Sequence, residues 1–94
     1  MNKPIKVGDF VVSLTGRDKS KCFLVVDLDK DKVFIVDGKT RKVDRPKVKN
    51  VKHVKQISTA NAQGVAENIK NGQAVGNKRI YKLIMTEKQK IQED

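Results

Sequence analysis

Residues 10–38 decide the fold, and they read FVVSLTGRDKSKCFLVVDLDKDKVFIVDG. This stretch holds three short apolar runs, Phe10 to Thr15, Cys22 to Leu28 and Val33 to Val36, with polar segments between them. In the first two runs apolar residues recur at every second position, which is typical of strands that bury one face. The faces expected to be buried carry Phe10, Val12 and Leu14 in the first run and Cys22, Leu24, Val26 and Leu28 in the second.

The segments between these runs have the composition of turns. Gly16 to Lys21 contains no apolar residue and predicts a loop, and Asp29 to Lys32 predicts a polar turn. Asp37-Gly38 suits a two-residue type I′ turn, because both central residues of that turn need positive φ. We therefore expect Lys39 to Val43 to return as a fourth, antiparallel strand.

A fifth strand is expected after Pro46, although its pattern is irregular. Apolar residues fall at positions 48, 51, 54 and 57, and a spacing of three is typical of neither a strand nor an ordinary helix. We predict a short strand from Val51 to Lys55 that is entered through a bulged segment. A single turn of tight helix is the alternative. The sequence thus predicts a mainly β fold.

The composition changes near Ser58 toward Ala, Asn, Gln, Gly and Lys, and two weaker helical patterns follow. The first spans Ala62 to Lys70, with Gly72 as a C-cap, and the second spans Lys78 to Lys90, with Asn77 as its N-cap. The second carries an apolar stripe, which needs either the sheet or another molecule as its partner. The stripe consists of Ile80, Leu83, Ile84 and Ile91, flanked by Tyr81 and Met85.

The charge balance points to a polyanionic partner. The 94 residues include 21 Lys and Arg against 11 Asp and Glu, a net charge of +10. Residues 1–57 hold 15 basic and 7 acidic groups (+8), and residues 58–94 hold 6 and 4 (+2). We predict one basic domain over 1–57 and a helical or partly disordered extension over 58–94. Nucleic acid is the commonest extended polyanion. An anionic membrane is the competing target, but it favours basic residues on an amphipathic helix.

Cysteine content and hydropathy favour the cytoplasm. Cys22 is the only cysteine, so neither an intramolecular disulfide nor a multi-cysteine metal site can form. The first twenty residues lack the apolar core of a signal peptide, and no apolar stretch reaches the roughly 20 residues of a membrane span. We expect a cytoplasmic protein that is monomeric when free and does not bind membranes.

Basic residues are densest between positions 39 and 55, where they outnumber the single acid, Asp44, by seven. Such a concentration repels itself unless a phosphate backbone or solvent neutralises it, so we predict nucleic-acid contacts, with a solvated surface as the alternative. A second focus lies in the first loop, at Arg17, Lys19 and Lys21. The residues of the dense segment are Lys39, Arg41, Lys42, Arg45, Lys47, Lys49, Lys52 and Lys55.

Arg17 is the sharpest candidate in the loop, because a guanidinium can fork onto a phosphate or stack on an unpaired base. Its alternative partner is a carboxylate, either Asp18 or Asp9. His53 lies within the basic segment and is expected at the surface or at the edge of the core, with stacking on a base as the alternative.

Catalytic and metal chemistry find little support in the sequence. Cys22 alternates with the apolar set and is expected to be an inert core thiol. Asp27, Asp29 and Asp31 alternate with lysines, and the glycine and distal Glu of a calcium loop are missing. The glycine patterns of phosphate-binding loops are also missing. We predict that the protein is not an enzyme and needs no cofactor or metal.

Residues 6–19, KVGDFVVSLTGRDK, resemble the opening of a KOW motif, which places Gly-Asp before an apolar strand and a glycine before a basic loop. Later segments extend the resemblance in the same order, to the fourteen-e family of large-subunit ribosomal proteins and their bacterial KOW-domain relatives. These segments are Cys22 to Leu28, Val36 to Val43, Arg45-Pro46-Lys47 and Val51 to Val54.

The resemblance implies a small five-stranded SH3-like barrel whose loops and basic strand edges contact ribosomal RNA of the large subunit. By position, the RNA-facing loop corresponds to Ser13 through Lys21 and the basic segment to Arg41 through His53. Two departures stand out: Ser20 replaces a glycine often found after the loop lysine, and the tail after Ser58 does not look like the extension of the eukaryotic proteins.

A second hypothesis is a protein adapter. KOW domains also occur in transcription elongation factors, and that likeness would permit the barrel to dock on RNA polymerase or on a ribosomal protein. The helix from Ile80 to Ile91 would then supply the contact.

Overall fold

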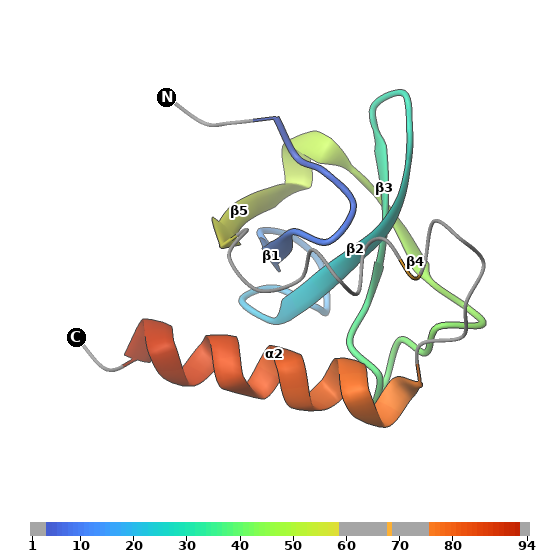
Figure 1. Ribbon diagram of the computed structural model, residues 1–94. Coiled ribbons are helices and arrows are strands. Elements are labelled where there is room, and N and C mark those ends of the chain that lie inside the picture. The colour runs from blue at the N-terminus through green and yellow to red at the C-terminus, as the bar shows by residue number, and fades with distance from the viewer. Residues whose placement is uncertain (1–3, 59–67, 69–75, 93–94) are drawn as a thin grey trace.

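The computed structural model describes residues 4–58, 68 and 76–92, and it shows a mainly β protein with a C-terminal helix (Figure 1). Three strands come in quick succession, followed by a long loop, a fourth strand, one turn of 3₁₀ helix and a fifth strand. The elements are β1 (Phe10–Ser13), β2 (Cys22–Asp29), β3 (Lys32–Val36), β4 (Lys47–Asn50), η1 (Val51–His53), β5 (Val54–Ser58) and α2 (Asn77–Gln92).

The five strands form one antiparallel sheet in the order β4-β3-β2-β1-β5. β4 and β5 are its two edges, so the sheet is open, whereas the sequence led us to expect a barrel. The register shifts between Val25 and Asp27 in β2 and between Phe10 and Val11 in β1. Bulges of this kind increase the local twist of a sheet. Figure 1 shows the curved sheet, in which η1 links the two edge strands, β4 and β5.

Both faces of the central strands are buried, because the sheet separates two apolar clusters. The first cluster lies under α2 and contains Phe10, Cys22, Leu24, Val26, Val36, Ile80 and Ile84. The second lies on the opposite face and contains Val11, Phe23, Val25, Val33, Ile35 and Val54. Burial of one such large side chain stabilises a fold by about 1.5–3 kcal/mol, so the two clusters account for much of the stability.

This two-sided burial corrects the predicted strand faces. Phe10 is buried as expected, but so are Val11 and Ser13 on the other face of β1. Leu14 is 44% exposed and Leu28 is 38% exposed, and both were expected in the core. Alternation therefore located the strands correctly, but it implied a single buried face where the fold has two.

The predicted type I′ hairpin at Asp37-Gly38 is wrong, and so is the fourth strand expected from Lys39 to Val43. Residues 37–46 form an irregular loop, and the strand that pairs with β3 is β4. The Asp37 carboxylate is the physical reason. Its Oδ1 accepts hydrogen bonds from the backbone N–H groups of Lys39, Thr40 and Arg41, at 2.7–2.9 Å. An aspartate that binds nearby amides in this way competes with ladder pairing.

A short hairpin does form one connection earlier. Asp29 pairs with Lys32, which leaves Lys30 and Asp31 as a two-residue turn, and Lys30 has a φ of 55°. The predicted strand from Val51 to Lys55 is wrong in its first three residues. Those residues form η1, the tight helical turn named as the alternative, and β5 begins only at Val54. The side chain of Asn50 caps η1 by accepting from the N–H of Lys52.

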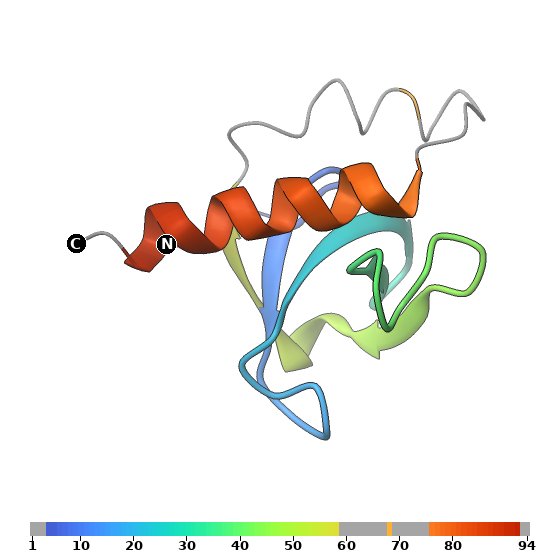
Figure 2. The same cartoon turned by 90° about the horizontal axis from the view of Figure 1, so that it is seen from below.

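α2 lies along one face of the sheet and crosses β2 (Figures 1 and 2). Its apolar stripe faces the sheet: Ile80 and Ile84 are buried there, and Leu83 packs beside them. The helix therefore takes the sheet as its partner, one of the two options left open by the sequence. Tyr81 and Met85 remain 37% and 40% exposed.

The start of α2 differs from prediction in one detail. The carbonyl oxygen of Gly76 accepts the first helical bond, from the N–H of Ile80, so Gly76 occupies the N-cap position. The side chain of Asn77 instead accepts a hydrogen bond from the N–H of Val43, at 2.7 Å. Asn77 thereby fastens the helix to the loop of residues 37–46.

Gly38 is required where this helix meets the loop. Its φ is 79°, and a Cβ atom there would collide with the carbonyl oxygen of Asn77 and lie 2.9 Å from the amide nitrogen of Tyr81. The predicted helix from Ala62 to Lys70, except for Asn68, and the predicted cap Gly72 lie outside the described residues. In the described part of the chain, no helix has the length and apolar character needed to cross a membrane.

Candidate nucleic-acid interface

The first loop, residues 14–21, is closed at its base by two backbone hydrogen bonds. The N–H of Ser20 donates to the Ser13 carbonyl at 2.8 Å, and the Ser13 N–H donates to the Lys21 carbonyl at 3.0 Å. Gly16 and Ser20 both have positive φ, 75° and 71°. Ser20 therefore occupies a backbone conformation that glycine adopts without strain. The loop tip projects from the sheet away from α2 (Figure 2).

Arg17 is exposed at this tip, and neither carboxylate considered as its partner binds it. Asp18 instead pairs with Arg41. The Asp9 carboxylate is buried and accepts a hydrogen bond from the side chain of Gln56 at 2.7 Å. The Arg17 guanidinium is thus left facing solvent, as are the ammonium-bearing side chains of Lys19 and Lys21.

A partly buried ion pair joins the first loop to the loop of residues 37–46. Arg41 Nη2 lies 3.2 Å from Asp18 Oδ2, and the two side chains are 35% and 8% exposed. Arg41 Nε is buried and has no hydrogen-bond partner among the described residues. Arg41, one of the predicted nucleic-acid contacts, therefore has a second task that its sequence position does not reveal, because it holds two basic loops together.

The first loop also contacts β4 and the helical turn η1 that follows it. Lys49 Nζ donates to the Thr15 carbonyl at 2.8 Å and lies 3.3 Å from Thr15 Oγ1. The N–H of Leu14 donates to the carbonyl of His53, at 2.8 Å. His53 itself is exposed on η1, as the sequence led us to expect. These bonds place η1 beside the first loop.

The loop of residues 37–46 is shaped by Asp37. Burial raises the pKa of this carboxyl group, but hydrogen bonds from the Thr40 side chain and from the N–H groups of Arg41, Lys39 and Thr40 outweigh it, and the pKa is lowered. The Thr40 hydroxyl lies 2.6 Å from Asp37 Oδ2. An ionised Asp37 therefore fixes the loop that presents the exposed residues Lys42 and Arg45.

Two basic stretches that are separate in the sequence thus meet in space. The first loop contacts residues 37–46 through Asp18 and Arg41, and it contacts η1 through Leu14 and His53. We call the exposed surface of these three segments the basic face, leaving out Lys39, which lies beside Tyr81 of α2. Its exposed basic side chains are Arg17, Lys19, Lys21, Lys42, Arg45, Lys52 and His53.

The remaining predicted contacts lie elsewhere or are partly covered. Lys39 Nζ lies over the ring of Tyr81, 5.7 Å from its centroid, on the side of the helix. Lys47 and Lys49 are half-buried in β4. Lys55 projects from β5, where it lines a shallow groove.

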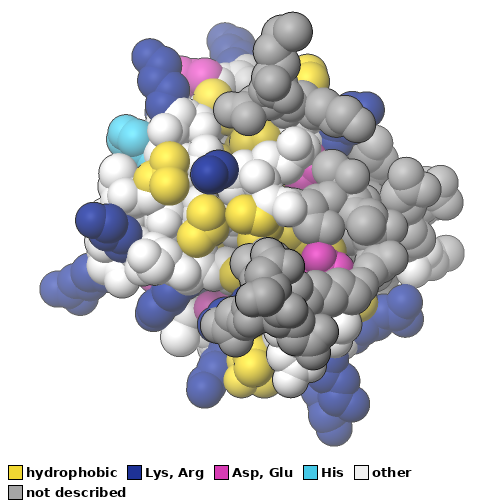
Figure 3. Space-filling view, turned by 90° about the vertical axis from the view of Figure 1, so that its left-hand side faces the viewer, with side chains coloured by type: hydrophobic (Ala, Val, Ile, Leu, Met, Phe, Trp, Pro, Cys, Tyr) yellow, Lys and Arg dark blue, Asp and Glu magenta, His cyan; other side chains and the backbone are white. Residues whose placement is uncertain are grey.

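That groove has apolar walls and a basic rim. It is lined by Pro4, Ile5, Leu14, Val51, Lys52, Val54, Lys55 and Gln56. Figure 3 shows apolar side chains gathered on the side of the molecule that carries β5, with Lys and Arg side chains around them. The exposed Leu14 is one wall of the groove, so it belongs to a surface feature and not to the core.

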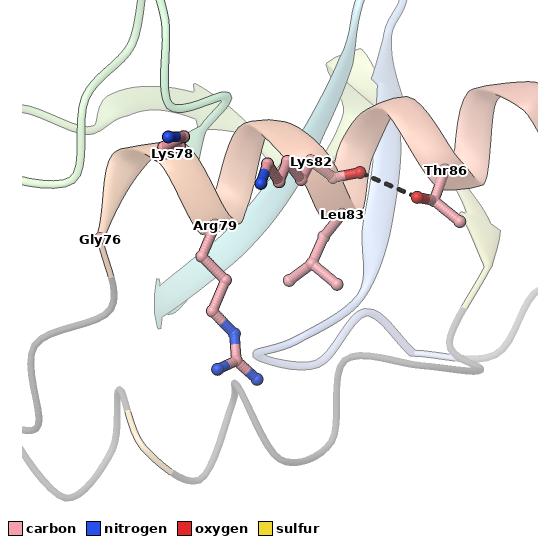
Figure 4. A pocket seen from close by; sticks show the side chains of 6 residues that line it. All are labelled: Gly76, Lys78, Arg79, Lys82, Leu83 and Thr86. Carbon is pink, nitrogen blue, oxygen red and sulfur yellow. Dashed lines mark hydrogen bonds between the residues drawn. The ribbon is translucent and has the colours of Figure 1, made fainter.

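The structure also places basic residues on α2 that the sequence analysis did not single out. Lys78, Arg79 and Lys82 line a pocket beside the helix together with Leu83 (Figure 4). The Thr86 hydroxyl donates to the Lys82 carbonyl at 3.0 Å, within the same turn. The spacing of Lys78, Arg79 and Lys82 along the helix is visible in the sequence. It gives a weaker signal for nucleic-acid binding than the denser basic segment from Lys39 to Lys55.

The groups considered for catalysis have ordinary structural settings. Burial is the main cause that raises the pKa of the Cys22 thiol, to about 11, so the thiol is protonated at neutral pH. Asp27, Asp29 and Asp31 are exposed at the β2–β3 turn. Within residues 4–58, 68 and 76–92, no three His, Cys, Asp or Glu side chains are grouped to hold a metal ion.

No protein-family model matches the chain, and no curated protein matches it at a significant level.

Proposed function

We propose that this protein binds RNA through the basic face, chiefly by contacts to phosphates. The observation that carries the proposal is the meeting of the first loop with residues 37–46 and η1. Of the seven basic side chains on this face, none pairs with a carboxylate among the described residues. A phosphate backbone would neutralise these charges and release its own counterions.

An SH3-like barrel is the fold that we infer from the strand arrangement together with the KOW resemblance. β1 lies between β2 and β5, and one 3₁₀ turn links the two edge strands. The second apolar cluster draws residues from β1, β2, β3 and β5, which supports a sheet curled around its own interior. Because β4 and β5 are open edges of the sheet, closure into a barrel is part of this proposal.

The mechanism follows from preorganisation. The hydrogen bonds at Ser13 and Thr15 and the ion pair at Asp18 hold the first loop before any ligand arrives, so less conformational entropy is lost on binding. Arg17 makes the most geometry-dependent contact, because its planar guanidinium can bind a phosphate with two hydrogen bonds. The lysines act as point charges that add affinity without orientation.

Ribosomal RNA of the large subunit is the target that the family resemblance favours, and ribosomal proteins are then neighbours. Sedimentation of a cytoplasmic lysate through a gradient tests this target. We expect the protein to comigrate with the large subunit and to be released by ribonuclease. Migration at the top of the gradient without ribonuclease treatment would contradict a ribosomal location.

Salt dependence tests the electrostatic mechanism in a purified system. If about five phosphates are neutralised, log affinity should fall with log salt concentration with a slope of roughly −4. Arg17→Gln should weaken binding and reduce the slope by about 1. Lys82→Gln, which removes the same charge from an exposed position on α2, is the matched control. A slope near zero, or equal effects of the two variants, would contradict binding through the basic face.

The adapter hypothesis has a weaker structural basis. The helix from Ile80 to Ile91 was expected to supply the protein contact, but its residues Ile80 and Ile84 are buried against the sheet and are not available to a partner. Tyr81 and Met85 are the exposed large apolar side chains among the helix residues whose burial the structure describes. RNA binding is therefore the function that we favour, and we propose a binding protein rather than an enzyme.

A further inference from the structure

A groove runs between α2 and the start of β2, outside the basic face. Tyr81 and Met85 line it from the helix and are 37% and 40% exposed. Cys22 and Ile84, both buried, form its apolar base. Tyr81 is the only tyrosine in the chain, which contains no tryptophan. An exposed ring on a firmly packed helix offers a flat surface that needs little ordering before a ligand stacks on it.

Positive charge surrounds this ring. Lys21, Lys39 and Lys88 line the groove, and they come from the first loop, from the loop of residues 37–46 and from α2. Asp37 is the one acid among the described lining residues, and hydrogen bonds from loop amides already occupy its carboxylate. The groove thus combines an aromatic surface with three lysines that can reach anionic groups.

The dimensions favour a small planar ligand. The groove has a volume of about 280 Å³, slightly below the range of about 300–1,000 Å³ that is usual for small-molecule pockets. Lys39 Nζ lies 5.7 Å from the Tyr81 ring centroid, so the ring face already attracts a cation. An exposed cation–π contact stabilises less than stacking of a base, so a base could take the ring face while Lys39 moves to an adjoining phosphate.

Lys21 connects this groove to the basic face, because it belongs to the first loop and also lines the groove. A strand bound along the first loop would therefore reach Tyr81 without leaving positively charged surface. Single-stranded RNA is bound by this combination of basic track and aromatic platform, whereas the faces of bases inside a duplex are covered by the neighbouring base pairs.

We infer that this groove holds one unpaired nucleotide of the bound RNA, with its base stacked on Tyr81 and its flanking phosphates near Lys21, Lys39 and Lys88. The inference rests on the proposed RNA-binding function and adds a preference to it. The basic face binds phosphates of any RNA, and the groove selects RNA that presents an unpaired base beside the bound backbone.

The test compares a short RNA hairpin that has an unpaired adenosine loop with a blunt RNA duplex of equal length. We expect the full-length protein to bind the hairpin about tenfold more tightly than the duplex, which is the scale of one stacked base. Tyr81→Ala should abolish this difference and leave the salt slope unchanged, because no charge is removed. Tyr81→Phe keeps the ring and should retain the preference. Circular dichroism of both variants checks that the helix is intact.

Intrinsic fluorescence gives a second, direct measurement. Because Tyr81 is the only tyrosine and there is no tryptophan, its emission reports this groove alone. We expect the hairpin to quench the emission, and the midpoint of the quenching should equal the midpoint of the binding curve. Titration of free N-acetyltyrosinamide with the same RNA corrects for absorbance by the RNA. The duplex should bind without comparable quenching.

The outcomes separate the two proposals. Salt-dependent binding with equal affinity of native protein and Tyr81→Ala for the hairpin would overturn the groove and leave the basic face intact. Loss of the preference in Tyr81→Phe as well as in Tyr81→Ala would also overturn stacking. Failure of the native protein to bind either RNA would overturn both proposals.

Discussion

Arg41 donates a hydrogen bond to Asp18 over 3.2 Å, and this contact joins two loops whose connecting residues lie 23 positions apart in the chain. The carboxylate is almost completely buried, while the guanidinium is about one-third exposed. A single acid thus holds an arginine in place between basic loops. Without it, the loops would repel one another, and the basic face would lose its fixed arrangement.

Replacement of Asp18 should show what this contact contributes. Asp18→Ala should lower the free energy of unfolding by about 1–2 kcal/mol, because Arg41 would lose its partner in a partly buried place. Urea denaturation at neutral pH measures the change. Asp44→Ala removes the same charge from an exposed position and should have little effect. Equal stability of the two variants would show that the ion pair does not hold the loops.

Ser20→Gly should stabilise the protein. Ser20 has a φ of 71°, and a residue with a Cβ atom pays about 1 kcal/mol or more in this left-handed conformation. Glycine also has more entropy in the unfolded state, which offsets part of the relieved strain, so we expect a net gain of about 0.5–1 kcal/mol in thermal or urea unfolding. Ser20→Ala keeps the Cβ atom and serves as the control. A gain of similar size in the alanine variant would rule out backbone strain as the cause.

Gly38→Ala should be strongly destabilising, by at least about 2 kcal/mol, because the added methyl group meets helix backbone that cannot rotate away. Gly76→Ala is the control without a steric clash, since a Cβ atom at Gly76 meets nothing within 4 Å, and it should cost only the smaller penalty of alanine at an N-cap. Thermal unfolding followed by circular dichroism measures both. A mild effect at Gly38 would mean that α2 can shift on the sheet without loss of packing.

The stability contributed by Asp37 should depend on pH. Its pKa in the folded protein is below the ordinary value of 3.8, so the ionised form is bound more favourably in the folded state. The contribution is therefore complete above pH 3.8 and is lost as the pH falls through the lower, folded-state value.

Asp37→Asn, which cannot ionise, should be less stable than the native protein at pH 7, and the difference should shrink in acid. Urea denaturation at several pH values between neutral and strongly acidic measures it, and Asp44→Asn controls for net charge. A difference that does not change with pH would exclude ionisation of Asp37 as its source.

Local sequence patterns predicted a strand well where the side chains of that strand themselves determine its conformation. Cys22 to Leu28 and Val33 to Val36 were located to within one residue, because apolar alternation and β-branched residues mark strands directly. The fourth strand was misplaced because the choice between a hairpin and a capped loop at Asp37 depends on which amides its carboxylate binds. Burial on both faces could not be inferred either, since it depends on α2 returning from far along the chain.

For the site, the sequence located the charge but not its arrangement. Exposure of Arg17, Lys19 and Lys52 follows from their polarity and from their places in turns. The diversion of Arg41 to Asp18, and of Lys49 to Thr15, depends on contacts between segments distant in the chain. The same is true of Tyr81, whose surroundings come from three separate segments.

The packing of α2 against the sheet also has a consequence for the timing of folding during synthesis. Phe10 and Leu24 belong to the same cluster as Ile80 and Ile84, so the cluster under the helix cannot close until α2 has left the ribosomal exit tunnel. Until then, the nascent sheet carries an uncovered apolar face, which is a state prone to association with other chains. The protein should therefore complete the cluster under the helix only after α2 has emerged, later than the strands that form the sheet.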